Sequence, residues 1–154
     1  RFIANMNRKI PPEHQARLRD DFEKFQRPFT KVFHDKGGQL MTGTDSLLPR
    51  LVPGFALHQE LHELVAVGLT PYEALRTTTT IPYQYLGESK QAGTIEVGKR
   101  TDLLLVDGNP LEDISAASRI VGIMMRGQWI AKEEIDRRMR KISQAAARAT
   151  RGSK

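Results

Sequence analysis

The stretch from Gly38 to Ser46 constrains the fold more than any other part of this sequence. It reads Gly-Gln-Leu-Met-Thr-Gly-Thr-Asp-Ser, which predicts a short buried strand over residues 39–43. The strand stops at Gly43, and the next loop presents the carboxylate of Asp45. Helical patterns precede and follow the stretch. The order helix, strand, loop, helix indicates a β/α fold, and we expect the chain to start partway through it.

The segment before this stretch predicts a long amphipathic helix. Pro11-Pro12-Glu13 is a suitable helix start, and Gly37-Gly38 is a suitable end. Pro28 lies inside the segment and is expected to kink or split the helix. The apolar residues recur at spacings of three and four, which places them on one face: Leu18, Phe22, Phe25, Phe29 and Val32.

Three shorter helices are predicted after the stretch. The first covers residues 55–67 and ends at Gly68, and its buried face is expected to carry Leu57, Leu61, Leu64 and Val65. Thr70-Pro71-Tyr72-Glu73 has the cap, proline and acidic residue of a helix start, so a second helix is expected from there to Thr78. A short third helix is predicted near residues 81–86.

The sequence changes character after Gly93, where glycines separate short β-prone runs. Residues 103–106 predict a compact buried strand, and residues 120–125 and 128–130 predict two more around a turn at Arg126-Gly127. Lys132 to about Arg148 predicts a helix whose apolar positions are sparse, and the last residues are expected to fray.

Length and composition restrict the class of protein. The 154 residues suffice for one domain with a core, and the absence of Cys excludes disulfides and thiolate metal sites. That absence fits a reducing compartment, and a cytoplasmic location is expected. No apolar run approaches the roughly 20 residues of a membrane span. The chain begins with Arg1 and has no leader pattern, so we expect a longer parent chain.

The net charge of +6 is concentrated at one end. Residues 132–154 contain eight Lys or Arg residues and three Asp or Glu residues, so the rest of the chain is nearly neutral. A solvated basic helix accounts for this, and nucleic-acid binding is not favoured because interleaved aromatic residues are missing. Binding of the basic tail to an acidic partner stays a separate hypothesis.

Asp45 is the first candidate for chemistry. A carboxylate after a glycine turn at a strand end can bind a divalent ion or accept a proton, although an Asx turn or a cap is also typical of loop Asp residues. His58 and His62 are the second candidate, because two histidines four apart on a helix can hold zinc. The zincin motif needs Glu after the first His, where this chain has Gln59, and Glu60 points to another face.

The remaining candidate residues have little support for a functional role. His14 and His34 have no acidic or histidine partner at a useful spacing, and Ser46 lacks the nucleophile-elbow motif. The glycine-rich segment 93–99 lacks the ending of a phosphate loop, so its glycines are expected to shape turns.

Several blocks together give the sequence a specific resemblance. They are Thr42-Gly43-Thr44-Asp45, the segment 54–61 (GFALHQEL), the segment 68–75 (GLTPYEAL), Leu86-Gly87, the segment 93–106 (GTIEVGKRTDLLLV) and the segment 109–114 (NPLEDI). In this order and density the chain resembles the carboxyl-terminal part of metal-dependent amidohydrolases, closest to prolidase-like and imidazolonepropionase-like members. The resemblance spans about residues 16 to 131.

The resemblance implies an α/β fold, the carboxyl-terminal portion of a TIM-like (β/α)8 barrel with strands of a small β-sandwich domain and a terminal helix. Residues 1–90 would end the barrel, residues 91–131 would belong to the sandwich, and residues 132–154 would form a basic helix and tail. It also implies hydrolysis of C–N bonds by metal-activated water. Asp45 would contact the metal and transfer the proton, and His58 would contact substrate.

The resemblance implies one or two divalent ions, with zinc expected, held mostly by residues absent from this chain. The family's His-x-His pair, its bridging Lys and its two later histidines have no counterparts here and would lie before Arg1. The implied partners are the upstream barrel half of the same protein, a small amide or peptide-like substrate, and further copies in a homo-oligomer, without a membrane. The alternative is a noncatalytic oligomerising module derived from that fold.

Overall fold

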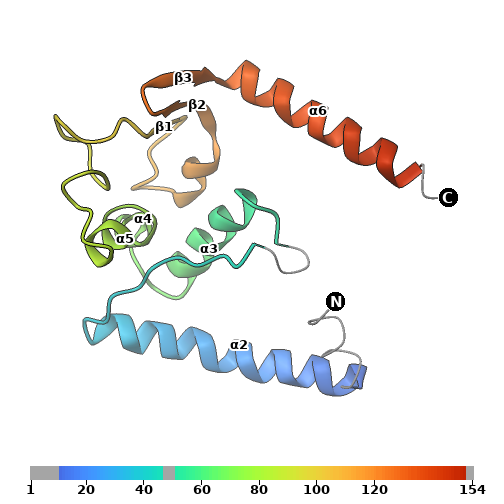
Figure 1. Cartoon of the computed structure of the whole chain (residues 1–154). Helices are drawn as coiled ribbons and strands as arrows, with labels where there is room; N and C mark the ends of the chain where they lie inside the picture. The colour runs from blue at the N-terminus through green and yellow to red at the C-terminus, as the bar shows by residue number, and fades with distance from the viewer. Residues whose placement is uncertain (1–10, 47–50, 152–154) are drawn as a thin grey trace.

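The computed structural model describes residues 11–46 and 51–151, which form a mixed α/β structure. The long helix α2 lies along one side of Figure 1, α3, α4 and α5 lie in the middle, and a small sheet leads into α6 on the opposite side. The elements, in chain order, are α2 (Pro12–Asp35), α3 (Phe55–Ala66), α4 (Pro71–Thr78), α5 (Thr80–Tyr85), β1 (Leu103–Val106), the 3-10 helix η1 (Ile114–Ser118), β2 (Ile120–Met125), β3 (Gln128–Ala131) and α6 (Lys132–Arg151).

Helix α2 begins and ends as its prolines and glycines predicted, and of the kink or split predicted at Pro28, the split is wrong. The helix continues through Pro28 to Asp35 without interruption. A proline inside a helix leaves the carbonyl four residues earlier without its donor, here that of Lys24. Both residues are exposed, so water can satisfy this carbonyl at little cost.

The apolar face of α2 is open to solvent. Phe25, Phe29 and Val32 are 62%, 55% and 57% exposed. The aromatic rings stack along the helix instead, with centroids 5.4 Å apart for Phe25 and Phe29 and 6.1 Å apart for Phe29 and Phe33. Leu18 and Phe22 are not among the side chains that the structure describes. Phe25 and Phe29 therefore share a face as the 3.6-residue periodicity predicted, and the described chain leaves that face exposed.

Helix α4 has the N-terminus that its sequence predicted. The Thr70 hydroxyl accepts a hydrogen bond from the Glu73 N–H at 3.2 Å, and the Glu73 carboxylate accepts one from the Thr70 N–H at 2.8 Å. The N–H bond from Thr70, and then its hydroxyl, hold the pKa of Glu73 below its usual value. This capping box satisfies backbone donors that a helix end otherwise leaves unpaired.

The core lies where α3 and α4 meet η1. Its buried members are Leu61, Ala74, Ile114 and Ala117, with Leu64, Val65 and Leu75 packed against them. Helix η1 was not predicted, because a 3-10 helix of five residues is too short to display a period. Asp113 caps it by accepting a hydrogen bond from the Ser115 N–H at 2.9 Å.

The predicted strands after residue 100 are confirmed in position, and they form one antiparallel sheet in the order β1-β2-β3. Arg126 and Gly127 have φ of 49° and 80°, which fits the tight turn between β2 and β3. The prediction that residues 103–106 are buried is wrong, since Leu103, Leu104 and Leu105 are 37%, 48% and 51% exposed. The described chain places too little structure against this sheet to cover both faces.

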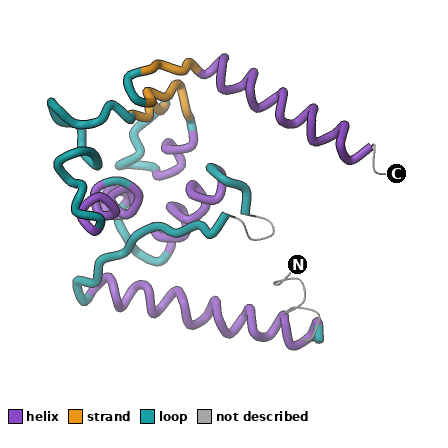
Figure 2. The backbone as a smooth tube through the Cα atoms, in the orientation of Figure 1, coloured by secondary structure: helices purple, strands orange, loops and turns teal. Residues whose placement is uncertain are grey.

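The predicted strand at residues 39–43 is wrong, because the segment is an open loop between α2 and α3 (Figure 2). A strand requires a neighbour to complete its backbone hydrogen bonds. Among the described strands, β1 and β3 each pair antiparallel with β2, and none of the three borders this segment. The assignment of residues 1–90 to a barrel, 91–131 to a sandwich and 132–154 to a separate tail therefore stays a prediction.

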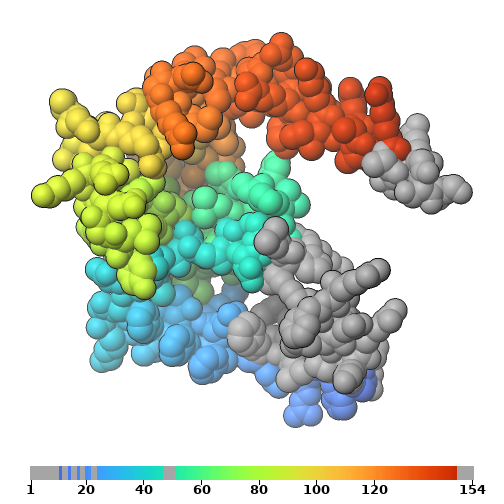
Figure 3. Space-filling model, viewed as in Figure 1, coloured from blue at the N-terminus to red at the C-terminus, as the bar shows by residue number. Residues whose placement is uncertain are grey.

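Helix α6 begins at Lys132 as predicted but runs to Arg151, past the predicted end near Arg148 and into the segment 150–154 that was expected to fray. Residues 152–154 lie outside the described residues. In the space-filling view of Figure 3 it extends away from the body of the described chain. None of the helices in the described ranges has the length and apolarity that crossing a bilayer requires.

Candidate functional site

The loop that carries Asp45 is attached to two helices. Thr42 donates from its backbone N–H and from its hydroxyl to the Thr77 carbonyl of α4, at 3.2 Å and 3.3 Å. The next residue, Gly43, donates its N–H to Oε1 of Glu60 on α3, at 2.8 Å. Thr77 is 1% exposed, so this end of the loop is fixed to the interior of the molecule.

Asp45 stands on the exposed side of this loop. Its φ is +46°, in the left-handed region that Asp tolerates better than most residues with a Cβ. The hydroxyls of the residues before and after it, Thr44 and Ser46, lie 2.5 Å apart in a hydrogen bond. The tight turn thus presents the carboxylate outward, and the residue is exposed.

His58 lies in the first turns of α3 and is half-buried. Its Nδ1 atom is buried without a hydrogen-bond partner among the described residues. Burial, and then the nearby His62, lower the pKa of His58. The neutral ring is therefore favoured, and Nδ1 can form a hydrogen bond with a donor or an acceptor group of a bound ligand.

The predicted site residues do not meet in the described part of the chain. No hydrogen bond or ion pair joins Asp45 to His58 among the described residues, and His62 is exposed. No group of three or more His, Asp or Glu side chains in those ranges could hold a metal ion. The described residues by themselves thus do not fit a metal, and the metal role of Asp45 stays a prediction.

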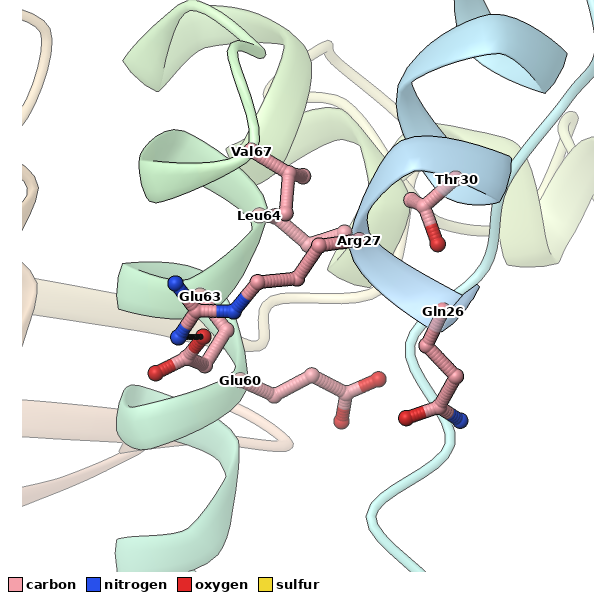
Figure 4. A pocket seen from close by; sticks show the side chains of 7 residues that line it. All are labelled: Gln26, Arg27, Thr30, Glu60, Glu63, Leu64 and Val67. Carbon is pink, nitrogen blue, oxygen red and sulfur yellow. Dashed lines mark hydrogen bonds and ion pairs between the residues drawn. The ribbon is translucent and has the colours of Figure 1, made fainter. Parts of the chain in front are cut away.

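A cavity of about 420 Å³ lies between α2 and α3. Figure 4 shows Arg27 reaching from α2 to Glu63 on α3, where the Nη2–Oε2 distance is 2.6 Å, while Glu60 points toward α2. Oε2 of Glu60 is buried and has no partner among the described residues. Seven residues line the cavity: Gln26, Arg27, Thr30, Glu60, Glu63, Leu64 and Val67.

Glu60 is the residue near the Asp45 loop that sequence reasoning missed. The sequence placed it only relative to the two histidines, on another face of the helix. Its contact with Gly43 joins residues 17 apart, and no spacing rule relates a loop glycine to a glutamate in the middle of the next helix. His34 is a similar case, since its Nε2 lies 3.4 Å from Oε1 of Glu73, so the prediction that it lacks an acidic partner is wrong.

Asp102 belongs to the segment 93–106, one of the blocks on which the family resemblance rests, and its hydrogen bonds stabilise the fold of the sheet. Its carboxylate accepts a hydrogen bond from the Arg126 N–H at 2.9 Å, which ties the start of β1 to the β2–β3 turn. That bond is the main cause that lowers the pKa of Asp102. In the neighbouring block, Gly93 and Gly98 have φ of 98° and 90°, as glycines that shape turns should.

Comparison with protein families gives a match over most of the chain. The model of the amidohydrolase family matches residues 3–130. The sequence matched none of the curated proteins with which it was compared.

Solved structures of prolidases and a dipeptidase are also similar to this chain. A prolidase complexed with N-methylphosphonate-L-proline is 29% identical, with a TM-score of 0.63 over 80% of this chain and 30% of its own. A Xaa-Pro dipeptidase with methionine bound in its active site is 27% identical, with a TM-score of 0.62 over 68% of this chain and 25% of its own. A candidate prolidase from Bifidobacterium longum is 34% identical, with a TM-score of 0.60 over 66% of this chain and 25% of its own. This chain thus spans 25% to 30% of the length of these structures.

Proposed function

We propose that this chain, which belongs to the amidohydrolase family, forms the carboxyl-terminal part of a hydrolase that cleaves C–N bonds in amide or peptide-like substrates. The observation that carries the proposal is the family match over residues 3–130. The similar solved structures, a prolidase and a Xaa-Pro dipeptidase, support it. They also make dipeptides that end in proline the first substrates to test.

Asp45 is the residue to which we assign the proton transfers. Water adds to the carbonyl carbon of the substrate, and its proton passes to the Asp45 carboxylate. The C–N bond then breaks, and the same proton passes to the leaving nitrogen, which departs as an amine. The Asp45 carboxylate is suited to this role because hydrogen bonds to α3 and α4 hold the start of its loop. The residue itself is exposed, so its oxygens stay accessible to a substrate.

His58 is the residue that we propose for substrate contact. Its unpartnered Nδ1 is a buried polar atom, and such atoms cost stability unless something bonds to them. A polar group of the substrate would supply that bond. Replacing His58 by Phe is then expected to raise KM more than it lowers kcat.

Family members generally use divalent metals, and we propose that this protein does too, with zinc as the first ion to test. The described residues offer Asp45 but no cluster of ligands around it. The other ligands would therefore come from further barrel residues.

We also propose that this chain works packed against the rest of a barrel. The open faces of α2 and β1 support this, since Phe25, Phe29 and Leu105 are each more than half exposed. Contiguous exposed apolar side chains are characteristic of surfaces that another segment covers. A noncatalytic oligomerising module would also use such faces, but the family match does not favour it.

The test is hydrolysis of Xaa-Pro dipeptides and acylated amino acids by the protein that carries the whole barrel. Asp45→Asn is expected to lower kcat by about 10²–10⁴-fold, the usual contribution of a general acid–base group. Asp20→Asn, at an exposed position on α2, is the matched control and should leave kcat unchanged. Full activity of Asp45→Asn would remove Asp45 from the reaction, and absence of any C–N hydrolysis would refute the proposed function.

A further inference from the structure

We propose that Glu60 is a positioning residue for Asp45. From α3, its carboxylate holds the Gly43 N–H at 2.8 Å, two residues before Asp45, and so fixes the turn that orients the reacting carboxylate. This inference rests on the proposed function of Asp45. It adds a second carboxylate to the site, one that acts through the loop backbone.

The contact between Glu60 and Gly43 is specific. Glu60 follows two residues after His58 on α3 and directly precedes Leu61, which is 4% exposed and belongs to the core. The backbone that carries Glu60 is therefore held by packing. Its Oε2 atom is buried without a described partner, although a Glu side chain is long enough to turn a carboxylate toward water. The bond from Gly43 accounts for the inward orientation, because a buried carboxylate oxygen is costly unless the group is held there.

The geometry of the loop transmits this contact to Asp45. Thr42 is fixed to the Thr77 carbonyl of α4, and Gly43 is fixed to Glu60 of α3. Asp45 itself has φ of +46°, a left-handed conformation that costs some energy even for Asp, so the anchored loop helps to maintain it. Without Glu60 the loop would keep its anchor on α4 but lose the one on α3, and Asp45 would be free to leave this conformation.

Amide hydrogen exchange of Gly43, measured by NMR on the full chain, tests the contact. Glu60→Ala is expected to speed exchange at Gly43 about 10- to 100-fold, since hydrogen bonds to charged groups contribute about one to two powers of ten in stability. Glu60→Gln should retain most of the protection, because its amide oxygen can accept the same bond. The control is Glu63→Ala, which removes the ion pair with Arg27; no hydrogen bond or ion pair joins Glu63 to the loop among the described residues.

Unchanged exchange at Gly43 in Glu60→Ala would overturn the inference. An equal increase of Gly43 exchange in Glu63→Ala would also overturn it, because it would indicate that any change on α3 destabilises the loop. If Glu60→Ala does not fold, Glu60→Asp decides, because its carboxylate is one methylene shorter and the 2.8 Å bond from Gly43 should be lost. Exchange at Gly43 should then speed up by a similar factor, and unchanged exchange in a folded Glu60→Asp would refute the contact.

Kinetics of the whole-barrel protein separate this inference from the proposed function. Glu60→Ala is expected to lower kcat about tenfold or more with KM changed less than about twofold, as for a group that acts only in the transition state. In an Asp45→Asn background the same change should have no further effect. If Asp45→Asn is inactive while Glu60→Ala keeps full kcat, the positioning role fails and the proposed function stands. If Asp45→Asn is fully active, the proposed role of Asp45 fails, whatever the Gly43 exchange shows.

Discussion

Replacing Leu61 by Ala tests where the stability of this chain resides. Leu61 is 4% exposed and contacts the buried cluster formed with Ala74, Ile114 and Ala117. It lies on α3, whereas its partners come from α4 and η1, so the substitution removes the side chain that joins the helical part to the segment before β2.

The expected cost follows from burial. Leu→Ala removes the equivalent of roughly three buried carbon groups at about 0.8 kcal/mol each, or about 2.4 kcal/mol from transfer alone. The cavity left behind raises the total to about 2–5 kcal/mol, as in other buried Leu→Ala changes. Natural domains have about 5–15 kcal/mol in all, so this one change should remove a large share of the stability.

Leu86→Ala is the matched control, because it has the same chemistry at a side chain that is 63% exposed. Burying a Leu side chain fully contributes about 1.5–3 kcal/mol, and Leu86 has about one third of that burial. Leu86→Ala should therefore lower the free energy of unfolding by roughly 0.5–1 kcal/mol. Urea denaturation of the full chain, followed by far-ultraviolet circular dichroism, measures both values from the shift in midpoint at constant slope. An equal or larger loss for Leu86→Ala would refute the assignment of the core to α3, α4 and η1.

Further predictions concern the helix cap, two titrating groups and the chain as a whole. Thr70→Ala should destabilise the chain by about 1 kcal/mol in the same urea assay, the usual cost of a lost N-cap, and an unchanged midpoint would contradict the capping box. Since the folded pKa of Glu73 is lowered from 4.5, its stabilisation is present above pH 4.5 and is lost as the pH falls below it, and Glu73→Gln should flatten this dependence. Because the pKa of His58 is lowered from 6.5, the unfolded chain binds the proton more tightly, so stability should fall as the pH drops below 6.5; a His58→Gln variant with the same pH dependence would argue against this. The isolated chain should unfold in a broad transition that further barrel residues sharpen, and a sharp cooperative melt of the monomer alone would count against that expectation.

Local features of the fold were predictable because short-range chemistry decides them. Thr70 and Glu73 form the cap that their spacing of three predicts, and Arg126-Gly127 forms the turn that its composition predicts. Periodicity also located the apolar face of α2. In each case the residues that interact lie within about one or two helical turns of each other, so their order in the sequence already contains the geometry.

The errors share a different origin. The segment 39–43, predicted as a strand, lacks a strand neighbour among the described residues. The strand at 103–106 is partly exposed, because little else in the described chain packs on it. Apolar composition indicates that a segment favours burial or strand pairing, but it does not indicate whether another segment is present to cover it or pair with it. Within the candidate site, the sequence singled out Asp45 and His58 by residue type, and their roles stay predictions.

The sequence by itself determined the helices, the small antiparallel hairpin, the concentration of positive charge on α6 and the resemblance to amidohydrolases. Only the tertiary structure decided that Glu60 bonds to Gly43, that Thr77 bonds to Thr42, and that the core gathers around Leu61. The physical reason is that these contacts join segments separated by loops, and the path of a loop depends on what the whole chain packs against rather than on the residues at either end.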